Sequence, residues 1–305
     1  MNESMEDIET IAKPGGSAQA VLEGAAAVVV ADVPVTLIDP PTGWQLVNIR
    51  ELWRYRELLF FLTWRDVKVR YKQTALGAAW AILQPVMMMV VFIVIFSRMA
   101  KVQSANIPYP VFVFAGLLPW TFFSTALANG ASSVVGSERL ITKIYFPRLA
   151  IPFAAVGAAL VDFAVAFGVL LVLMVWYRIM PGWQVFLVPV LILVVTLAAL
   201  GVGTLLAALT VAYRDFKYVV PFLLQIWLFA TPSVYMDVSA TGSSRTQMLL
   251  WINPMVSVIA SFRAVMLGQP LQWNHLLVSA AFCAAALIVG CLYFRKVEDS
   301  FADLI

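Results

Sequence analysis

Long apolar runs separated by short polar connections dominate the chain from about residue 78 onward. Six runs each offer about twenty apolar residues, the length that an α-helix needs to cross the hydrocarbon core of a bilayer. A seventh apolar stretch, 249–268, contains the helix-breaking pair Asn253 and Pro254 and the charged Arg263. Broken backbone at membrane depth is tolerated only where protein surrounds it, so we expect re-entrant helices there. The predicted spans are 78–97, 111–135, 149–176, 184–211, 219–235 and 275–294.

The distribution of basic residues predicts how these spans are oriented. If the N-terminus is inside, the inner segments from residue 44 onward hold fourteen Lys and Arg residues and the outer segments hold five. Loops on the cytoplasmic side of membrane proteins are enriched in Lys and Arg. The pattern therefore predicts an all-α integral membrane protein with six spans and both termini in the cytoplasm.

The composition of the chain supports a membrane location, and the composition of its N-terminal residues differs from that of the rest. The chain is 62% hydrophobic and 12% charged, against about 25% charged in soluble domains. Residues 1–43 carry seven acidic residues and one base and are rich in Gly, Ala and Pro. We expect an acidic, disordered cytoplasmic tail over 1–43 and a membrane domain over 44–305.

An amphipathic helix is expected over 48–73, just before the first span. In its second half one face is cationic and the neighbouring face is partly aromatic, which is typical of a helix lying in the membrane interface. It either anchors the topology only or also guides a phosphate-bearing lipid head group toward the protein. The residues assigned to this interface are Trp64, Arg65, Lys68, Arg70, Tyr71 and Lys72.

The motifs of several catalytic classes are missing from the sequence. It contains no GxxxxGK[ST], HExxH, CxxC or GxSxG, so we assign no catalytic residue, metal site or cofactor to this chain. Cys283 and Cys291 lie in one apolar run and are interpreted as packing residues, and the single His275 cannot form a histidine cluster. Asp162, within the third span, is either a proton-relay acid or a lone carboxylate that is solvated or bonded to a neighbour.

Aromatic side chains crowd the outer half of the second span and recur in the fifth. Aromatic belts are common in membrane proteins, but aromatic faces also pack against sugar rings. Both interpretations stay open. The candidates for a glycan path are Tyr109, Phe112, Trp120, Phe123, Trp227 and Tyr235.

Five motifs in order resemble the permease subunits of ABC exporters for polysaccharides, the family of O-antigen, capsule and teichoic-acid exporters. They are LTWRDVKVRYKQTALGAAWAILQPV, LITKIYFPRLAIP, AYRDFKYVVPFLLQIWLFATPSVY, NPMVSVIASFRAVMLG and RKVEDSFADLI. The resemblance implies a homodimer in the bacterial inner membrane, bound to two cytoplasmic ATPase subunits that hold ATP and Mg²⁺. It also implies a lipid-linked polysaccharide as substrate, contact with membrane lipid, and no nucleic acid.

The connector SERLITKIYFPRLAIP, residues 137–152, resembles the coupling helix of this family, which docks on the ATPase. A permease without a nucleotide site must receive force mechanically, and this connector pairs an apolar face with charged residues. The rival interpretations are a permease for a drug or lipid, and a membrane-embedded glycan-modifying enzyme. The coupling residues are Glu138, Arg139, Leu140, Ile141, Ile144, Tyr145, Phe146 and Arg148, with Arg214 and Asp215 in a second inner turn.

Overall fold

A computed structural model describes residues 53–72, 77, 79–99, 107–143, 146–234, 250–298 and 301. The acidic tail of 1–43 and the start of the expected interface helix therefore lie outside the described residues. The same holds for Ile144, Tyr145 and Tyr235 among the candidate site residues.

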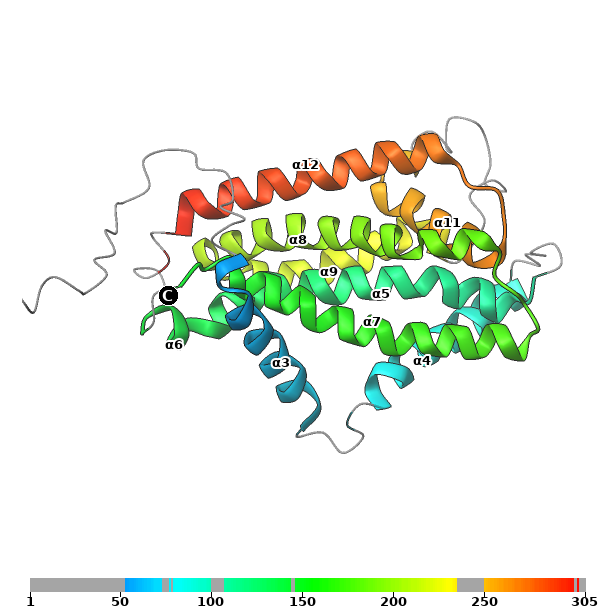
Figure 1. Cartoon of the computed structure of the whole chain (residues 1–305), viewed down its shortest axis with the longest axis horizontal. Coiled ribbons are helices and arrows are strands. Elements are labelled where there is room, and N and C mark those ends of the chain that lie inside the picture. Colours follow the sequence, from blue (N-terminus) through cyan, green and yellow to red (C-terminus); the bar gives the residue numbers. More distant parts are fainter. Residues whose placement is uncertain are drawn as a thin grey trace, which may run out of the picture. The chain divides into compact units, whose positions relative to one another are not determined.

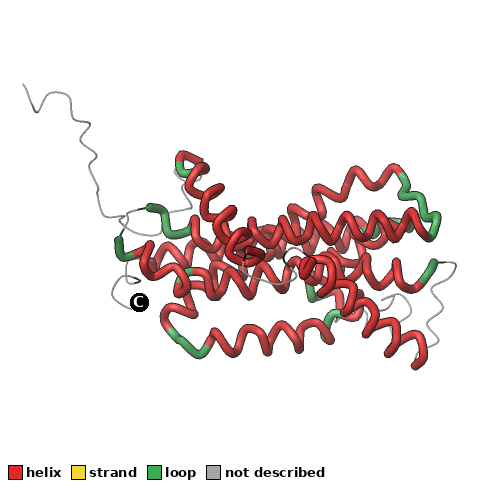
Figure 2. Tube along the Cα trace, turned by 90° about the horizontal axis from the view of Figure 1, so that it is seen from below, coloured by secondary structure: helices red, strands yellow, loops and turns green. Residues whose placement is uncertain are grey.

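The described residues form nine α-helices and contain no strand (Figure 2). Three short 3₁₀-helices lie between them, η1 (Val135–Ser137), η2 (Trp183–Leu187) and η3 (Pro232–Val234). The α-helices are α3 (Arg56–Lys72), α4 (Ala79–Met99), α5 (Tyr109–Ser133), α6 (Glu138–Ile141), α7 (Ala150–Trp176), α8 (Val188–Ala212), α9 (Phe216–Phe229), α11 (Pro254–Leu267) and α12 (Trp273–Val297).

Four of the six expected spans are helices long and apolar enough to cross a membrane, namely α5, α7, α8 with η2, and α12. The other two, the apolar part of α4 (Ala79–Ile95) and α9, are shorter. The span predicted over 219–235 is shorter because α9 ends at Phe229 and Pro232 begins η3. A residue before proline is biased away from the helical region, which accounts for this early end.

Helix α5 lies at the centre of the bundle. It contacts α4, α7, α8, α9 and α11, while α12 packs mainly on α8 (Figure 1). In the apolar window of α5, 78% of residues are buried, against 28% in α12. The turn at α6 and the helix α11 lie at opposite ends of the bundle (Figure 1).

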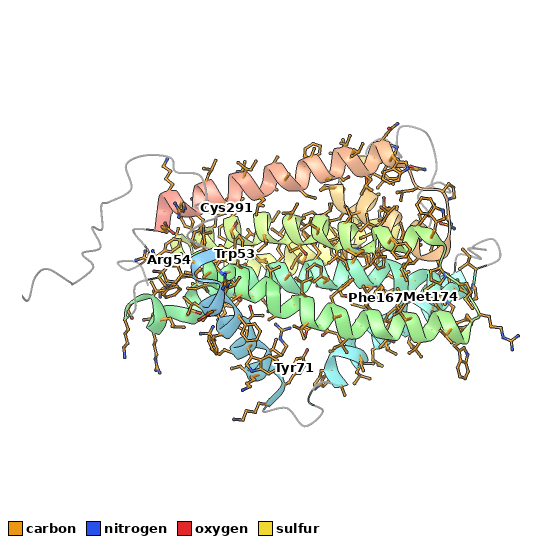
Figure 3. The ribbon with its side chains drawn as sticks, in the orientation of Figure 1. Trp53, Arg54, Tyr71, Phe167, Met174 and Cys291 are labelled. Atoms are coloured by element: carbon orange, nitrogen blue, oxygen red, sulfur yellow. The ribbon has the colours of Figure 1, made fainter. Side chains whose placement is uncertain are left out.

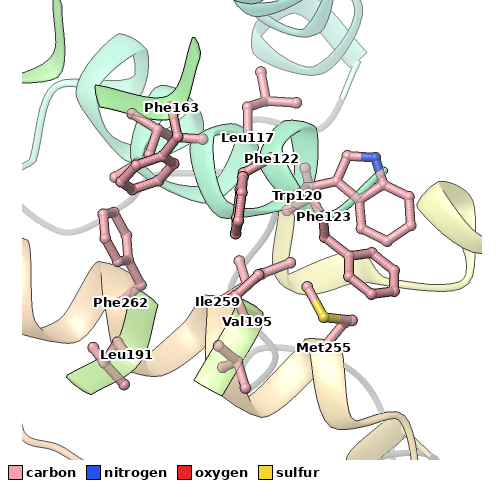
Figure 4. Close-up of a cluster of buried hydrophobic side chains, with 14 of the residues drawn as sticks. Leu117, Trp120, Phe122, Phe123, Phe163, Leu191, Val195, Met255, Ile259 and Phe262 are labelled. Carbon is pink, nitrogen blue, oxygen red and sulfur yellow. The ribbon is translucent and has the colours of Figure 1, made fainter. Parts of the chain in front are cut away.

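Aromatic and aliphatic side chains fill the space between α5, α7, α8 and α11 (Figure 4). Phe163 on α7 packs edge-on against Phe122 on α5, with ring centroids 5.4 Å apart, and against Phe262 on α11, at 6.3 Å. Such T-shaped contacts add about 0.5–1.5 kcal/mol each to the contribution of apolar burial. They hold α11 inside the bundle.

Two glycines allow α8 and α12 to approach closely. A side chain at Gly290 on α12 would meet the carbonyl oxygen of Gly201 on α8 and, at 2.7 Å, the hydroxyl of Thr204. A side chain at Gly201 would in turn meet the backbone of Leu287. Small residues at such positions let membrane helices pack backbone to backbone.

Helix α11 is a short helix with well-formed ends. The Asn253 side chain accepts a hydrogen bond from the Met255 N–H at 3.1 Å and donates one to Thr231 Oγ1 at 2.9 Å. Gly268 ends the helix in the left-handed conformation, φ 68°, as is common at helix C-termini. Fourteen residues reach about 21 Å, less than the hydrocarbon core of about 30 Å. Helix α11 alone is therefore too short to cross the bilayer, and the re-entrant placement expected over 249–268 stays a prediction.

Candidate functional site

The short helix α6 and the residues after it form one end of the bundle. Glu138, Arg139 and Lys143 are exposed, whereas Ile141 and Phe146 keep only 7% and 6% of their surface accessible. The two apolar side chains belong to a second buried cluster, to which α3, α7, α8 and α12 also contribute. The α6 turn is therefore fixed to the ends of the long helices, with its charged residues facing outward.

Part of the apolar face that was predicted to dock on the ATPase is packed inside the chain. Ile141 and Phe146 are buried within the chain itself, and Leu140 is half-buried. Their burial beside α8 and α12 already removes their apolar area from water, which is the main gain that docking would give. Among the described residues of this turn, a partner would first meet the exposed Glu138, Arg139 and Lys143.

The second candidate turn, between α8 and α9, lies at the same end of the bundle as α6. Arg214 and Asp215 are exposed there. Val211, one turn earlier on α8, is buried in the same cluster as Ile141 and Phe146. Arg148 is half-buried at the start of α7. The two predicted coupling turns are thus neighbours on one surface.

An ion pair connects α3 to the middle of α7. Arg70 Nη1 donates to one carboxylate oxygen of Asp162, and the hydroxyl of Tyr71 donates to the other. The side chains of Arg70 and Asp162 are 30% and 20% exposed. Asp162 lies about 18 Å along α7 from its first residue, Ala150. The carboxylate is therefore bonded to a neighbouring helix, one of the two roles that the sequence left open for it.

The protonation state of Tyr71 suits its role as a donor. Burial raises the pKa of Tyr71, and the cation of Arg70 opposes this only in part. The phenol is thus neutral throughout the ordinary pH range and keeps its O–H for Asp162. Arg70 and Tyr71, two of the residues predicted to contact the lipid interface, therefore bond a side chain of α7.

The other interface residues of α3 stay on its outer face. Lys68 and Lys72 are exposed, and Lys68 Nζ lies 5.6 Å from the centre of the Trp64 ring, which is 49% exposed. Arg65 pairs with its neighbour Asp66 at 2.8 Å. Figure 3 shows α3 slanting away from the α6 end of the bundle, with Tyr71 near its far end. The helix thus has one face on the bundle and a cationic, aromatic face outside.

Two cavities flank the ion pair. The first, of about 570 Å³, lies between α3, α4, α5, α7 and α9 and is lined by Asp162, Arg70 and Gln84 among others. The second, of about 490 Å³, lies between α3, α5, η1 and α7. Arg70 and Asn129 line both cavities. The ion pair therefore stands where two hollows along α5 meet.

A stripe of polar side chains on α5 lines these hollows. Its members follow each other at spacings of one, three and four residues, so they share one face of the helix. The sequence already shows this spacing as a polar face on an otherwise apolar span. The candidates for a glycan path were chosen by their aromatic rings and therefore do not include it. The stripe consists of Thr121, Ser124, Thr125, Asn129, Ser132 and Ser133.

The aromatic residues proposed for a glycan path have different surroundings. Trp120 and Phe123 are 4% and 1% exposed, and both rings pack against Trp227 on α9, with centroids 6.3 Å and 5.2 Å away. These two rings fill a helix interface in this chain, and the glycan path stays a prediction. Tyr109 stacks on Phe112 at the start of α5, 6.2 Å between centroids.

The described residues offer no cluster of three or more His, Cys, Asp or Glu side chains for a metal ion. Cys283 and Cys291 are free and buried. Both pack on neighbouring helices as members of the two buried clusters.

Comparison with known proteins places the chain in a family. Residues 57–267 match the family of ABC-2 type transporters. The chain is 36% identical over 259 residues to the O-antigen export system permease protein RfbA of Myxococcus xanthus, covering 84% of this chain and 98% of that protein. A protein of the same name from Klebsiella pneumoniae is 27% identical over 250 residues, 82% and 95% of the two chains.

A polysialic acid transport protein is similar over much of the same length. The polysialic acid transport protein KpsM of Escherichia coli is 27% identical over 243 residues, which is 77% of this chain and 92% of that protein. The matched family region begins in α3 and ends at the last residue of α11, so it contains the ion pair, both cavities and the α6 turn. This chain is a member of the ABC-2 type transporter family.

Proposed function

We propose that this chain is the membrane subunit of an ABC transporter that exports a lipid-linked polysaccharide across the bacterial inner membrane. The observation that carries the proposal is the 36% identity over 259 residues to an O-antigen export permease. In the proposed complex two copies of the chain form the membrane part. Two cytoplasmic subunits bind ATP and Mg²⁺ and supply the energy, so this chain catalyses no reaction itself.

The proposed topology has six spans, with α6 in the cytoplasm and α11 on the outer side. Its support is the charge at the two ends of the bundle. The α6 end carries the cationic residues Arg139, Lys143, Arg148, Arg214, Lys217, Arg295 and Lys296. The opposite end of the bundle has fewer basic residues among those that the structure describes, and Arg178 is one of them. This asymmetry is the one expected when the α6 end is cytoplasmic.

The cationic face of α3 is the proposed place of first contact with the substrate. Lys68 and Lys72 are exposed beside Trp64, which suits a phosphate head group at the membrane surface. Behind them, the polar stripe on α5 and the cavities around Arg70 offer hydrogen-bond partners to a hydrated glycan. A hydrophobic drug or an ordinary lipid would gain little from such a stripe, because its polar groups would be left unpaired.

Deletion of the gene tests the proposal. Cells without this chain are expected to lose their surface polysaccharide while the lipid-linked precursor accumulates inside, since synthesis continues and export stops. Surface polysaccharide is measured by immunoblot, and the precursor by extraction of membrane lipids. Normal surface polysaccharide in the deletion strain would exclude the proposed function. Restoration by the wild-type gene is the control for effects on neighbouring genes.

Reversal of charge at α6 tests the coupling role. Glu138→Arg is expected to lower export at least tenfold without reducing the amount of protein in the membrane, because Glu138 is exposed and bonds no described side chain through its carboxylate. The measurement is surface polysaccharide, together with co-purification of the ATPase. Arg178→Glu, an equally exposed reversal at the other end, is the matched control and should export normally. Full export by Glu138→Arg would remove α6 from the coupling surface.

A further inference from the structure

A third cavity lies at the end of the bundle opposite α6, between α11 and the starts of α5 and α12. Its volume is about 300 Å³, at the lower end of the range of about 300–1,000 Å³ typical of small-molecule sites. Such a volume has room for one sugar ring and not for a chain of rings. Phe112, a member of the predicted glycan path, lines this cavity, and neither of the cavities beside α3 includes it.

A buried arginine forms the polar centre of this cavity. Arg263 on α11 is 4% exposed, and its guanidinium lies 3.8 Å from the centre of the Phe112 ring. A cation–π contact covers one flat side of the guanidinium, and the N–H donors lie along its edges. A guanidinium has five N–H donors, so it can bond a ligand in addition to a neighbour in the protein. None of the described residues that line the cavity is acidic.

A second buried polar group is directed to the same cavity. Ser257 lies six residues before Arg263 on α11 and is 1% exposed, and its hydroxyl has no hydrogen-bond partner among the described residues. A buried hydroxyl without a partner costs free energy. A ligand that bonds Ser257 would recover this cost. Gln269, just after α11, lines the cavity and adds an amide that can both donate and accept hydrogen bonds.

An aromatic wall completes the cavity. Trp251 and His275 stack with their ring centroids 4.0 Å apart and their planes 13° from parallel. Both side chains are half-buried and line the cavity. Amphipathic rings of this kind offer apolar surface together with N–H groups at their edges. The combination of aromatic surface, an amide, a hydroxyl and a guanidinium suits a sugar ring with one negative charge.

We propose that this cavity binds a sugar residue that carries a carboxylate, with the carboxylate on Arg263 and the ring beside Trp251. One guanidinium matches the two oxygens of one carboxylate in a bidentate pair, and the hydroxyl of Ser257 bonds a ring substituent. The inference rests on the proposed function, under which a chain of sugars leaves the transporter at this end. It narrows the substrate class to glycans that contain acidic sugars.

The binding test uses the full chain, purified in lipid nanodiscs, and saturation-transfer NMR with three probes. Glucuronate is expected to bind in the millimolar range, and glucose and inorganic phosphate at least tenfold more weakly. Arg263→Gln should weaken glucuronate binding at least tenfold, and Ser257→Ala threefold or more. Arg178→Gln, an exposed arginine at the same end, should bind like the wild type. If Arg263→Gln fails to fold, Ser257→Ala and Trp251→Leu decide the question.

Three results would overturn the proposal. They are equal binding of glucose, binding of phosphate as strong as that of glucuronate, and unchanged glucuronate binding by the Arg263 and Ser257 variants. The test uses no export and no ATPase, so its failure is distinct from failure of the proposed function. A deletion strain that loses surface polysaccharide, with a protein that binds no glucuronate, would leave the transporter in place and remove only this site.

Discussion

Replacing Gly290 by leucine is expected to prevent the chain from accumulating as a folded protein. The new Cβ would collide with the backbone carbonyl of Gly201 and would lie 2.7 Å from the Thr204 hydroxyl. Overpacking in a well-packed core costs about 1–3 kcal/mol when side chains can move. Here backbone atoms stand in the way, so α8 and α12 must separate and the loss should exceed about 3 kcal/mol.

The measurement for Gly290→Leu is the amount of monodisperse protein after extraction from membranes, with its thermal unfolding midpoint. Gly290→Ala should lie between the wild type and Gly290→Leu. Gly168→Leu is the matched control, because a side chain at Gly168 on α7 would meet nothing within 4 Å. Equal yields and midpoints for the two leucine variants would contradict the close contact of α8 with α12.

The apolar periodicity of the sequence predicts most of the helices, because lipid as solvent demands long apolar runs. The predicted boundaries of 111–135 and 149–176 lie within two residues of α5 (Tyr109–Ser133) and α7 (Ala150–Trp176). The prediction is less accurate where proline decides the end of a helix. The run 219–235 contains enough apolar residues for a span, yet α9 ends at Phe229, ahead of Pro232.

The sequence predicts which helix an apolar side chain belongs to more easily than it predicts which residues that side chain packs against. Phe146 and Ile141 have the character of a docking face when the α6 connector is considered alone. Only the three-dimensional neighbourhood of Val211 and Phe294 shows that they complete a cluster within the chain. Likewise, the sequence alone makes Trp120 and Phe123 candidates for sugar contact. In the structure both rings pack against Trp227 on α9. Burial depends on contacts between distant segments, which one sequence does not specify.

Polar partners were the least predictable part of the site. Arg70 and Asp162 are 92 residues apart, and each has a local explanation, one as an interface cation and the other as a lone carboxylate. An unpaired charge at membrane depth is costly, so Asp162 is expected to have a partner. This expectation does not tell which residue the partner is. Several cations of α3 were available, and the crossing of α3 over α7 selects Arg70.

Reversing the charge of Asp162 should release α3 from α7 and stop export. Asp162→Arg places two cations side by side and removes both hydrogen bonds, from Arg70 and from Tyr71. Hydrogen bonds to charged groups contribute about 1.5–3 kcal/mol each, and partial exposure of this pair favours the lower figure. We expect at least tenfold less surface polysaccharide and faster tryptic cleavage of α3 at Lys68 and Lys72 in membranes.

The reciprocal variant separates pairing from simple damage. Arg70→Asp alone should fail like Asp162→Arg, whereas the double variant Arg70→Asp with Asp162→Arg should regain part of both export and protease resistance, because the pair is restored with its charges exchanged. Asp66→Ala is the matched control, since Asp66 pairs with Arg65 on the same helix and fastens α3 to nothing else among the described residues. A double variant no better than either single one would show that the ion pair does not hold α3 in place, and the contact between α3 and α7 would then rest on the apolar packing of Leu62.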